Sequence, residues 1–307
     1  MMNTPKTRQG FTYLLQPGDE DWKLATLLRR EFGFSGHLMY KFKEQDRILL
    51  NGNPVPGYTK GQPGDRLEVL LPQESSYFEP EDIPIHPVYE DEDLLILNKQ
   101  PGVTVHPTNG HKEHTLANGL MQYMADTRQT FKIRFINRLD MDTSGLLMVA
   151  KNAHAQNALN QQMRADETEK RYQAVVAGIV EEDAFTINLP IGRPPDSIRR
   201  AVLPVTENGY PSITHVKVLE RYPSGYTLVE LRLETGRTHQ IRVHMSHIGH
   251  PLLGDWLYDG PMDLFPSRQA LHAYYLAFRH PVTGVRTEVR APLPEDIAQL
   301  LETLRNQ

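Results

Sequence analysis

The sequence contains no cysteine. A chain without cysteine forms no disulfide and offers neither a thiolate ligand for zinc nor a cysteine nucleophile, and this composition is expected of a cytoplasmic protein. No apolar run reaches the ~18 residues that suggest a membrane-spanning helix. The polar segment Met1–Gly10 carries Lys6 and Arg8 without an apolar core. We therefore expect neither a secretory signal nor a membrane anchor.

Cofactor motifs are missing as well. Neither a Walker-type phosphate loop nor a Gly-x-Gly-x-x-Gly segment occurs, so we expect no nucleotide cofactor. The imidazoles of His239, His244, His247 and His250 are close in sequence, but they lack the spacing of a His-Glu-x-x-His site. We interpret them as hydrogen-bonded structural side chains and expect no metal site.

The net charge of −5 argues against a nucleic-acid partner only if the charges are evenly spread. Acidic residues crowd into one segment: Glu74, Glu79, Glu81, Asp82, Glu90, Asp91, Glu92 and Asp93. Basic residues recur in small groups elsewhere: Lys41, Lys43 and Arg47; Lys132, Arg134 and Arg138; Lys170 and Arg171; Arg193, Arg199 and Arg200; Arg237 and Arg242. Local basic patches can bind RNA phosphates, so the composition leaves this partner open.

Hydrophobic patterns predict an α+β chain of two folded parts. Residues 11–72 predict a small module, residues 73–87 an extended acidic linker that stays away from RNA, and residues 88–307 a larger domain. In the module we expect helices at residues 21–32 and 37–43 and strands at residues 48–50 and 66–70. In the larger domain we expect strands at residues 93–99, 146–150, 169–178, 215–219 and 226–233, helices at residues 115–124, 153–164, 237–248 and 295–304, and a basic loop or hairpin at residues 191–205.

One polar stretch, Asn137–Gly145, precedes the buried strand expected at residues 146–150. It places an arginine, two aspartates, a threonine and a serine in a short loop that a rigid sheet can hold, and chemistry is often carried by such loops. A polar turn in which Asp140 only caps the backbone explains these nine residues equally well.

Three separated motifs resemble those of the RluA-type RNA pseudouridine synthases. They are Arg138-Leu139-Asp140-x-x-Thr143-Ser144-Gly145, Lys170-x-Tyr172-x-Ala174 and Gly236-Arg237-x-His239-Gln240-Ile241-Arg242-x-His244. The first family motif usually opens with histidine, whereas this chain has Asn137. The resemblance implies a catalytic domain with a mixed, largely antiparallel sheet flanked by helices, and an isomerisation of uridine that needs no cofactor.

The resemblance also implies roles for single residues. Asp140 is the catalytic carboxylate, which attacks the ribose, attacks the base or removes a ribose proton. Tyr172 packs on the flipped base, because an aromatic face replaces lost stacking. Arg237 is expected to pair with Asp140, with Arg242 as the alternative. The expected RNA contacts in this domain are Arg138, Thr143, Lys170 and Arg242.

The module at residues 11–72 resembles the alpha-L RNA-binding module named after a ribosomal small-subunit protein. That resemblance implies RNA contacts by Lys41, Lys43 and Arg47. We expect a monomer whose partner is RNA, with large-subunit ribosomal RNA favoured over transfer RNA. Two alternatives remain: a non-catalytic RNA-binding or ribosome-assembly protein on the same fold, and a glycosidase-like hydrolase that uses Asp140 and Asp142.

Overall fold

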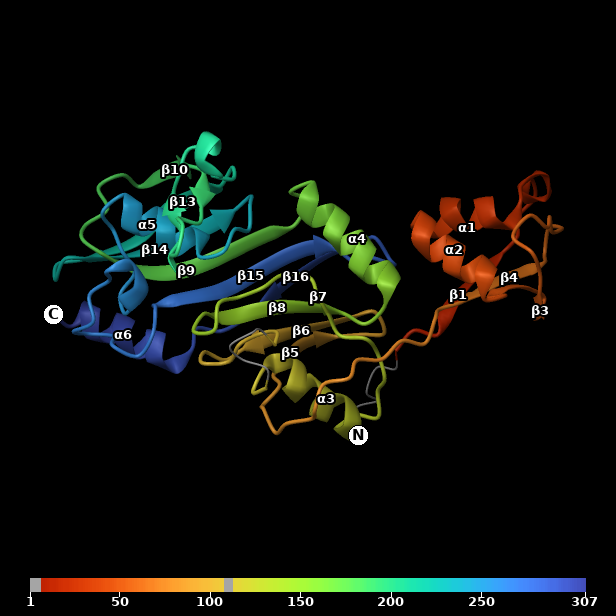
Figure 1. Cartoon of the computed structure of the whole chain (residues 1–307), viewed down its shortest axis with the longest axis horizontal. Helices are drawn as coiled ribbons and strands as arrows, with labels where there is room; N and C mark the ends of the chain where they lie inside the picture. Colours follow the sequence, from red (N-terminus) through yellow and green to blue (C-terminus); the bar gives the residue numbers. More distant parts are fainter. Residues whose placement is uncertain (1–6, 108–112) are drawn as a thin grey trace.

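The computed structural model describes residues 7–107 and 113–307, and it shows a small N-terminal module beside a larger body (Figure 1). The module contains β1 (Gly10–Leu14), the 3₁₀ turn η1 (Asp19–Asp21), α1 (Leu24–Phe32), α2 (Gly36–Glu44), β2 (Ile48–Leu50), β3 (Asn53–Pro54) and β4 (Arg66–Leu70). Its strands form an antiparallel sheet in the order β1-β4-β2-β3. Both predicted helices are present, and β1 was not predicted.

Local sequence explains the two module helices. Gly33 ends α1 because it adopts a left-handed conformation with φ of 64°. Ser35 then begins α2, and its side chain accepts a hydrogen bond of 3.3 Å from the Leu38 backbone N–H. The apolar faces of both helices pack against the sheet and give the module a core of its own.

The larger body is built on a ten-stranded sheet in the order β10-β13-β14-β9-β15-β8-β6-β5, with β16 paired to β15 and β7 to β8. Its strands are β5 (Pro87–Glu90), β6 (Leu94–Lys99), β7 (Arg134–Phe135), β8 (Ser144–Ala150), β9 (Glu169–Ala177), β10 (Ala184–Asn188), β13 (Ile213–Tyr222), β14 (Tyr226–Leu233), β15 (Leu271–Arg279) and β16 (Arg286–Arg290). Among the described strands of this sheet, β8 and β15 are the parallel pair and the other pairs are antiparallel. The predicted α+β class with a mixed, largely antiparallel sheet is confirmed.

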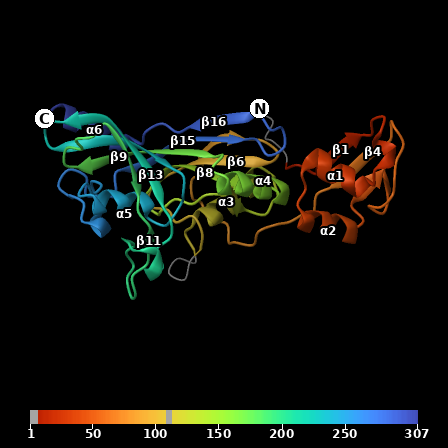
Figure 2. The same cartoon turned by 90° about the horizontal axis from the view of Figure 1, so that it is seen from above.

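Helices cover the sheet on both faces. They are α3 (Leu116–Asp126), α4 (Ala153–Arg164), α5 (Gln240–His247) and α6 (Glu295–Arg305), with 3₁₀ turns η2 (Val205–Glu207) and η3 (Trp256–Tyr258). The main core packs α3 and α5 against one face, while α4 and α6 cover separate parts of the other. The short hairpin of β11 (Ile191–Gly192) and β12 (Ala201–Val202) stands out on the same side as α5 (Figure 2). No helix in residues 7–107 or 113–307 is long and apolar enough to cross a membrane.

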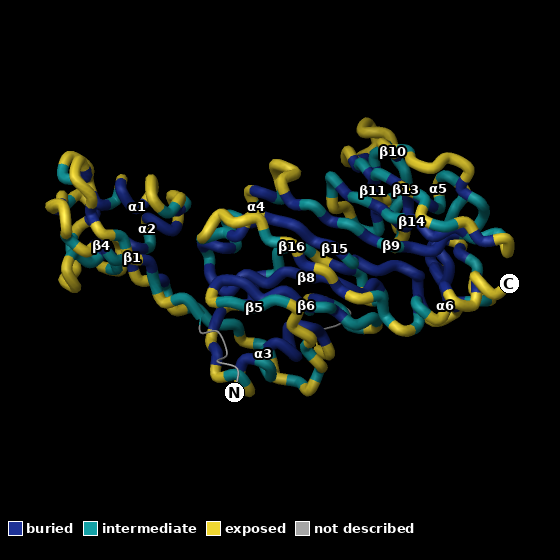
Figure 3. Tube along the Cα trace, turned by 180° about the vertical axis from the view of Figure 1, so that it is seen from behind, coloured by how far each residue is buried: buried dark blue, intermediate teal, exposed yellow. Residues whose placement is uncertain are grey.

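The junction between β8 and β15 lies in the middle of the sheet, where the strands are buried along most of their length (Figure 3). Gly145 pairs with Ala273 across this junction. Its φ is 114°, and a Cβ at this position would lie 2.2 Å from the Ala273 carbonyl oxygen. The glycine of the first motif is therefore required by close backbone approach and not by contact with a substrate.

Residues 73–86, which fall within the predicted linker, contain no helix or strand, and they pack along the larger body. Phe78 and Ile85 lie against the main core. The Ser76 hydroxyl accepts a hydrogen bond of 2.9 Å from the Ile133 backbone N–H. The segment is therefore fastened to the sheet at several points before β5 begins.

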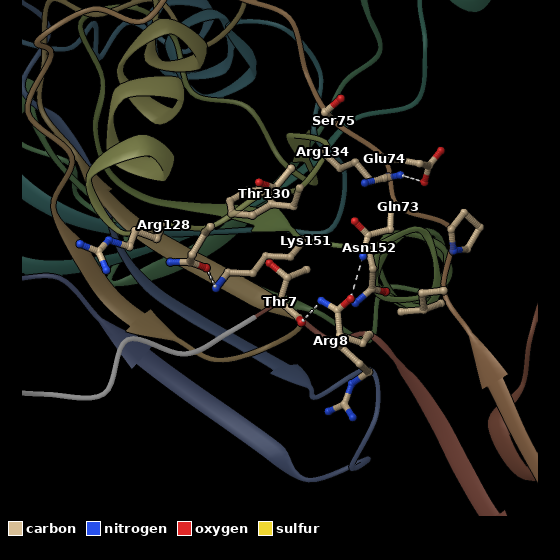
Figure 4. Close-up of a pocket in the computed structure, with 15 residues that line it drawn as sticks. Thr7, Arg8, Gln73, Glu74, Ser75, Arg128, Thr130, Arg134, Lys151 and Asn152 are labelled. Atoms are coloured by element: carbon tan, nitrogen blue, oxygen red, sulfur yellow. Dashed lines mark hydrogen bonds and ion pairs between the residues drawn. The ribbon is translucent and has the colours of Figure 1, made fainter. Parts of the chain in front are cut away.

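A cavity of about 450 Å³ lies where this segment and residues 7–9 cross between the module and the body (Figure 4). Three cations at this junction are neutralised locally. Arg8 forms a bidentate pair with Asp93, Arg134 pairs with Glu74, and the buried Lys151 pairs with Glu90 at 2.7 Å. Three carboxylates of the acidic segment are therefore neutralised by cations around this cavity.

Gly145→Ala should lower the free energy of unfolding by about 1–3 kcal/mol, because the added methyl group overlaps the Ala273 carbonyl. Gly36→Ala is the matched control: Gly36 lies at the start of α2 with no atom within 4 Å of an added Cβ. That change should alter stability by no more than ~1 kcal/mol. Urea denaturation followed by circular dichroism measures both, and equal effects of the two changes would contradict the role assigned to Gly145.

Candidate active site

Asp140 lies in the loop between β7 and β8, and the loop is tied to the strand that follows it. The Asp140 carbonyl accepts a hydrogen bond of 3.1 Å from the Thr143 N–H, which closes a tight turn. The Asn137 amide donates to the Leu146 carbonyl at 3.1 Å and accepts from the Met148 N–H at 2.8 Å. Asn137 thus extends the β7–β8 pairing past the end of β7, which gives a physical role to the residue that departs from the family motif.

The floor of the loop is a buried lysine that the sequence did not single out as a site residue. The Lys99 ammonium donates to the carbonyls of Gln100, Val103 and Met141 at 2.8, 2.9 and 2.7 Å. Burial lowers the pKa of Lys99 to about 7, and the carboxylates of Asp142 and Asp140 oppose that shift. Lys99 therefore holds the loop in place through backbone oxygens.

Thr143 and Ser144 also support the loop from inside. Thr143 is buried, and its hydroxyl accepts a hydrogen bond of 3.1 Å from the Gln269 amide. The Ser144 hydroxyl lies 3.0 Å from Nδ1 of the buried His272. Thr143 lines the small pocket next to Asp140, yet its hydroxyl already has a protein partner. Its predicted contact with RNA stays a prediction.

Arg242, from α5, supplies the guanidinium that faces Asp140. Its Nη1 lies 3.2 Å from Oδ2 of Asp140, and its Nε and Nη2 form a bidentate pair with Asp255, at 2.7 Å each. The Arg242 side chain is 7% exposed and that of Asp255 is fully buried. The guanidinium also lies over the ring of Tyr258, 5.0 Å from its centroid. The arginine is thus held in one orientation by a second carboxylate and an aromatic face.

The expected ion pair between Arg237 and Asp140 is wrong. Arg237 is exposed, and its guanidinium lies 5.6 Å from the centroid of the Tyr210 ring. The reason is that α5 begins at Gln240, not at Arg237. The Gln240 side chain accepts a hydrogen bond of 3.0 Å from the Arg237 N–H, so Arg237 belongs to the preceding turn. The alternative, Arg242, forms the pair.

Tyr172 approaches the same carboxylate from β9. Its side chain is largely buried, and burial together with the negative charge of Asp140 raises the pKa of its hydroxyl. Lys170 lies two residues earlier on the same side of the strand, and burial lowers its pKa. Strand β9 therefore presents an aromatic ring and an amine on the same side, and both line the cleft that contains Asp140.

These groups line a cleft of about 1050 Å³. Of the predicted site residues, the cleft brings together Arg138, Asp140, Lys170, Tyr172 and Arg237. A small adjoining pocket adds Thr143 and Arg242 beside Asp140. Asp142 lines neither cavity in the described residues, so the arrangement does not offer the paired carboxylates that a hydrolase needs.

The basic residues of the module lie outside this cleft. Lys41 pairs with Glu74 at 3.5 Å, and the Arg47 guanidinium donates to the Leu71 carbonyl at 3.0 Å. Lys43 is exposed. Sequence reasoning also missed Lys99, His239, Asp255 and Tyr258. The third motif contains His239, but nothing in the sequence shows that Asp255 and Tyr258 fold back onto Arg242.

Comparison with known proteins agrees with this geometry. The RNA pseudouridylate synthase family model matches residues 93–247. An uncharacterised RNA pseudouridine synthase of Bacillus subtilis (strain 168) is 43% identical over 285 residues, which cover 91% of this chain and 92% of that protein. The chain belongs to this family. It is an RNA pseudouridine synthase, an isomerase, and the alternative of a non-catalytic RNA-binding protein is disfavoured.

Other relatives are also similar to this chain over most of its length. Ribosomal large subunit pseudouridine synthase D of Escherichia coli (strain K12) is 40% identical over 274 residues, which cover 84% of this chain and 83% of that protein. Among solved structures, human RNA pseudouridylate synthase domain containing 1 is 29% identical, covers 75% of this chain and 98% of that chain, and superposes with a TM-score of 0.57.

Arg242→Ala should lower the stability of the synthase by about 3–5 kcal/mol, because it leaves the buried carboxylate of Asp255 without its partner. Arg237→Ala removes the same charge from an exposed side chain and should change stability by less than ~0.5 kcal/mol. Thermal and urea unfolding of the two variants measure the difference. A larger loss in the Arg237 variant would overturn the assignment of the buried pair.

Proposed function

We propose that this synthase converts uridine to pseudouridine in large-subunit ribosomal RNA, with Asp140 as the reacting carboxylate. The observation that carries the proposal is the Asp140–Arg242–Asp255 arrangement at the wall of a cleft that also contains Tyr172. Several relatives are named as large-subunit ribosomal pseudouridine synthases, which supports this choice of RNA. That substrate would place the enzyme in the cytoplasm.

The reaction breaks the bond between N1 of uracil and C1′ of ribose and forms a bond between C5 and C1′. The base rotates between these steps, C5 loses its proton and N1 gains one, so no redox partner is needed. Arg242 holds Oδ2 of Asp140, which leaves the other oxygen of the carboxylate for the nucleotide. Tyr172 offers its ring to the flipped base.

The rest of the cleft suits an extruded nucleotide in an RNA strand. Arg138 and Arg164 line it together with Lys170 and Arg237, so cations surround the reacting carboxylate. Arg138 and Arg237 are exposed and can contact phosphates, whereas Lys170 is buried beside Tyr172. The site is assembled within one chain, and we propose that the synthase acts as a monomer.

The module provides a second RNA contact at a distance from the chemistry. A hollow of about 420 Å³ on its surface is lined by three cations, Lys23, Arg29 and Lys43, and one carboxylate, Asp46. Tyr58, which is 73% exposed, also lines it. Cations around an exposed aromatic ring suit a flexible RNA strand, because phosphates pair with the cations while a base stacks on the ring. We propose Lys43 as the RNA contact, while Lys41 and Arg47 hold the module's exit segment.

Asp140→Asn should abolish turnover and leave RNA affinity within about threefold of the wild type, because the amide keeps the shape of the side chain but cannot act as nucleophile or base. Tritium release from RNA transcribed with 5-tritiated uridine measures turnover, and filter binding measures affinity. Turnover within tenfold of the wild type would refute the role of Asp140. Release of free uracil by the wild type would instead indicate a hydrolase.

Lys43→Ala should weaken binding to large-subunit ribosomal RNA and lower the slope of log affinity against log salt by roughly 0.7–0.9, the change expected for one lost phosphate contact. The matched control is Lys217→Ala. Lys217 is exposed on β13 beside the buried Val216, so it points away from the core face that carries the cleft. Equal slopes for Lys43→Ala and the wild type would show that this part of the module does not touch RNA.

A further inference from the structure

His239 stands beside Asp140 without being used in the mechanism described above. It caps the start of α5 and lines both the cleft and the smaller pocket. Its Nε2 lies 3.9 Å from Oδ2 of Asp140, which is too long for a hydrogen bond. Among the described residues no acceptor lies within hydrogen-bond distance of this nitrogen, so it faces the reaction space with its bonding capacity unused.

The other ring nitrogen has a partner that determines the tautomer. Nδ1 of His239 and the Tyr258 hydroxyl oxygen are 2.8 Å apart. The same oxygen accepts a hydrogen bond of 2.8 Å from the Arg200 backbone N–H. An amide N–H can only donate, so the Tyr258 oxygen is the acceptor there. Among the described residues, Nδ1 is the one acceptor within hydrogen-bond distance of the Tyr258 hydroxyl, so the hydroxyl hydrogen is assigned to Nδ1. Nδ1 then accepts, and the ring hydrogen is carried by Nε2.

The surroundings keep the ring neutral and in place. Burial lowers the pKa of His239, the charge of Asp140 opposes that shift, and Arg242 adds to it. The Tyr258 side chain that orients the ring is buried beneath the Arg242 guanidinium. Arg242, which holds the Asp140 carboxylate, and Tyr258, which orients His239, therefore pack directly against each other.

We propose that His239 contacts the substrate directly: its Nε2–H donates a hydrogen bond to an oxygen of the target nucleotide, either a uracil carbonyl or the ribose 2′-hydroxyl, while Asp140 reacts with that nucleotide. Nε2 lies 3.9 Å from the Asp140 carboxylate and His239 lines the same two cavities, so a nucleotide that reaches this carboxylate lies close to Nε2. A fixed donor at this place stabilises charge that develops on the nucleotide oxygen during the reaction. This inference rests on the proposed function.

Three substitutions separate this role from a structural one. His239→Gln places an amide N–H near the position of Nε2, His239→Asn places it near Nδ1, and His239→Leu removes the donor. If the donor at Nε2 matters, Gln should perform better than Asn. The backbone favours Asn instead, because His239 has φ of 59° and asparagine tolerates this left-handed conformation better than glutamine does. A structural role thus predicts that Asn performs at least as well as Gln, and a donor role predicts the reverse.

The single-turnover rate of tritium release from 5-tritiated large-subunit ribosomal RNA tests the proposal, with RNA affinity measured in parallel. We expect His239→Gln to exceed His239→Asn and His239→Leu by about tenfold or more in rate, with affinities within about threefold of one another. An Asn rate that equals or exceeds the Gln rate would overturn the proposal, as would losses confined to affinity. Wild-type turnover on the same RNA shows whether the proposed function itself holds.

The accepting oxygen is identified with short RNAs that contain 2-thiouridine, 4-thiouridine or 2′-deoxyuridine at the modified position. Each replacement weakens or removes one acceptor. We expect one of the three to slow the wild type by about tenfold more than it slows His239→Leu, and that one identifies the oxygen. Equal slowing of both proteins by all three replacements would show that His239 donates to none of these oxygens, and the proposal would fall.

Discussion

The active site depends on one guanidinium shared between two carboxylates. Asp255 is fully buried and holds Arg242 by two hydrogen bonds, so the arginine reaches Asp140 with a single nitrogen in a set orientation. Burying the Arg242–Asp255 pair costs desolvation energy. In return the pair fixes the position of the guanidinium charge beside Asp140, which a mobile surface arginine could not do. Tyr258 extends the same support to His239, so the carboxylate and the neighbouring imidazole are placed by one cluster.

The catalytic loop is rigid because backbone groups on both sides of it are satisfied. Lys99 donates hydrogen bonds to three backbone carbonyls, and the Asn137 side chain bonds to a carbonyl and an N–H of β8. Gly145 allows the end of the loop to lie directly against β15. The first motif therefore combines two kinds of residue. Arg138 and Asp140 face the cleft, whereas Thr143, Ser144 and Gly145 build the turn that presents them.

The sequence predicted the elements with clear periodicity, and α4 is found at the predicted residues. Strands β15 and β16 were missed. Arg242 was named only as the alternative partner of Asp140, and its pairing with Asp255 was missed. Every residue from Gln240 to Met245 is buried, so the helix has no polar face from which the orientation of an arginine could be inferred. Only the tertiary fold brings Asp255 to Arg242, and no local pattern carries that information.

The distribution of paired charge explains how a chain of net charge −5 suits an RNA substrate. Several carboxylates of the acidic segment pair with cations near the module junction: Glu74 with Lys41 and Arg134, Glu90 with Lys151, and Asp93 with Arg8. The charges of those carboxylates are therefore largely neutralised within the protein. The cleft is different, because four cations line it against two carboxylates, Asp140 and Glu234. The field that an approaching RNA phosphate meets is therefore set by the local lining, and the net charge is a poor guide to it.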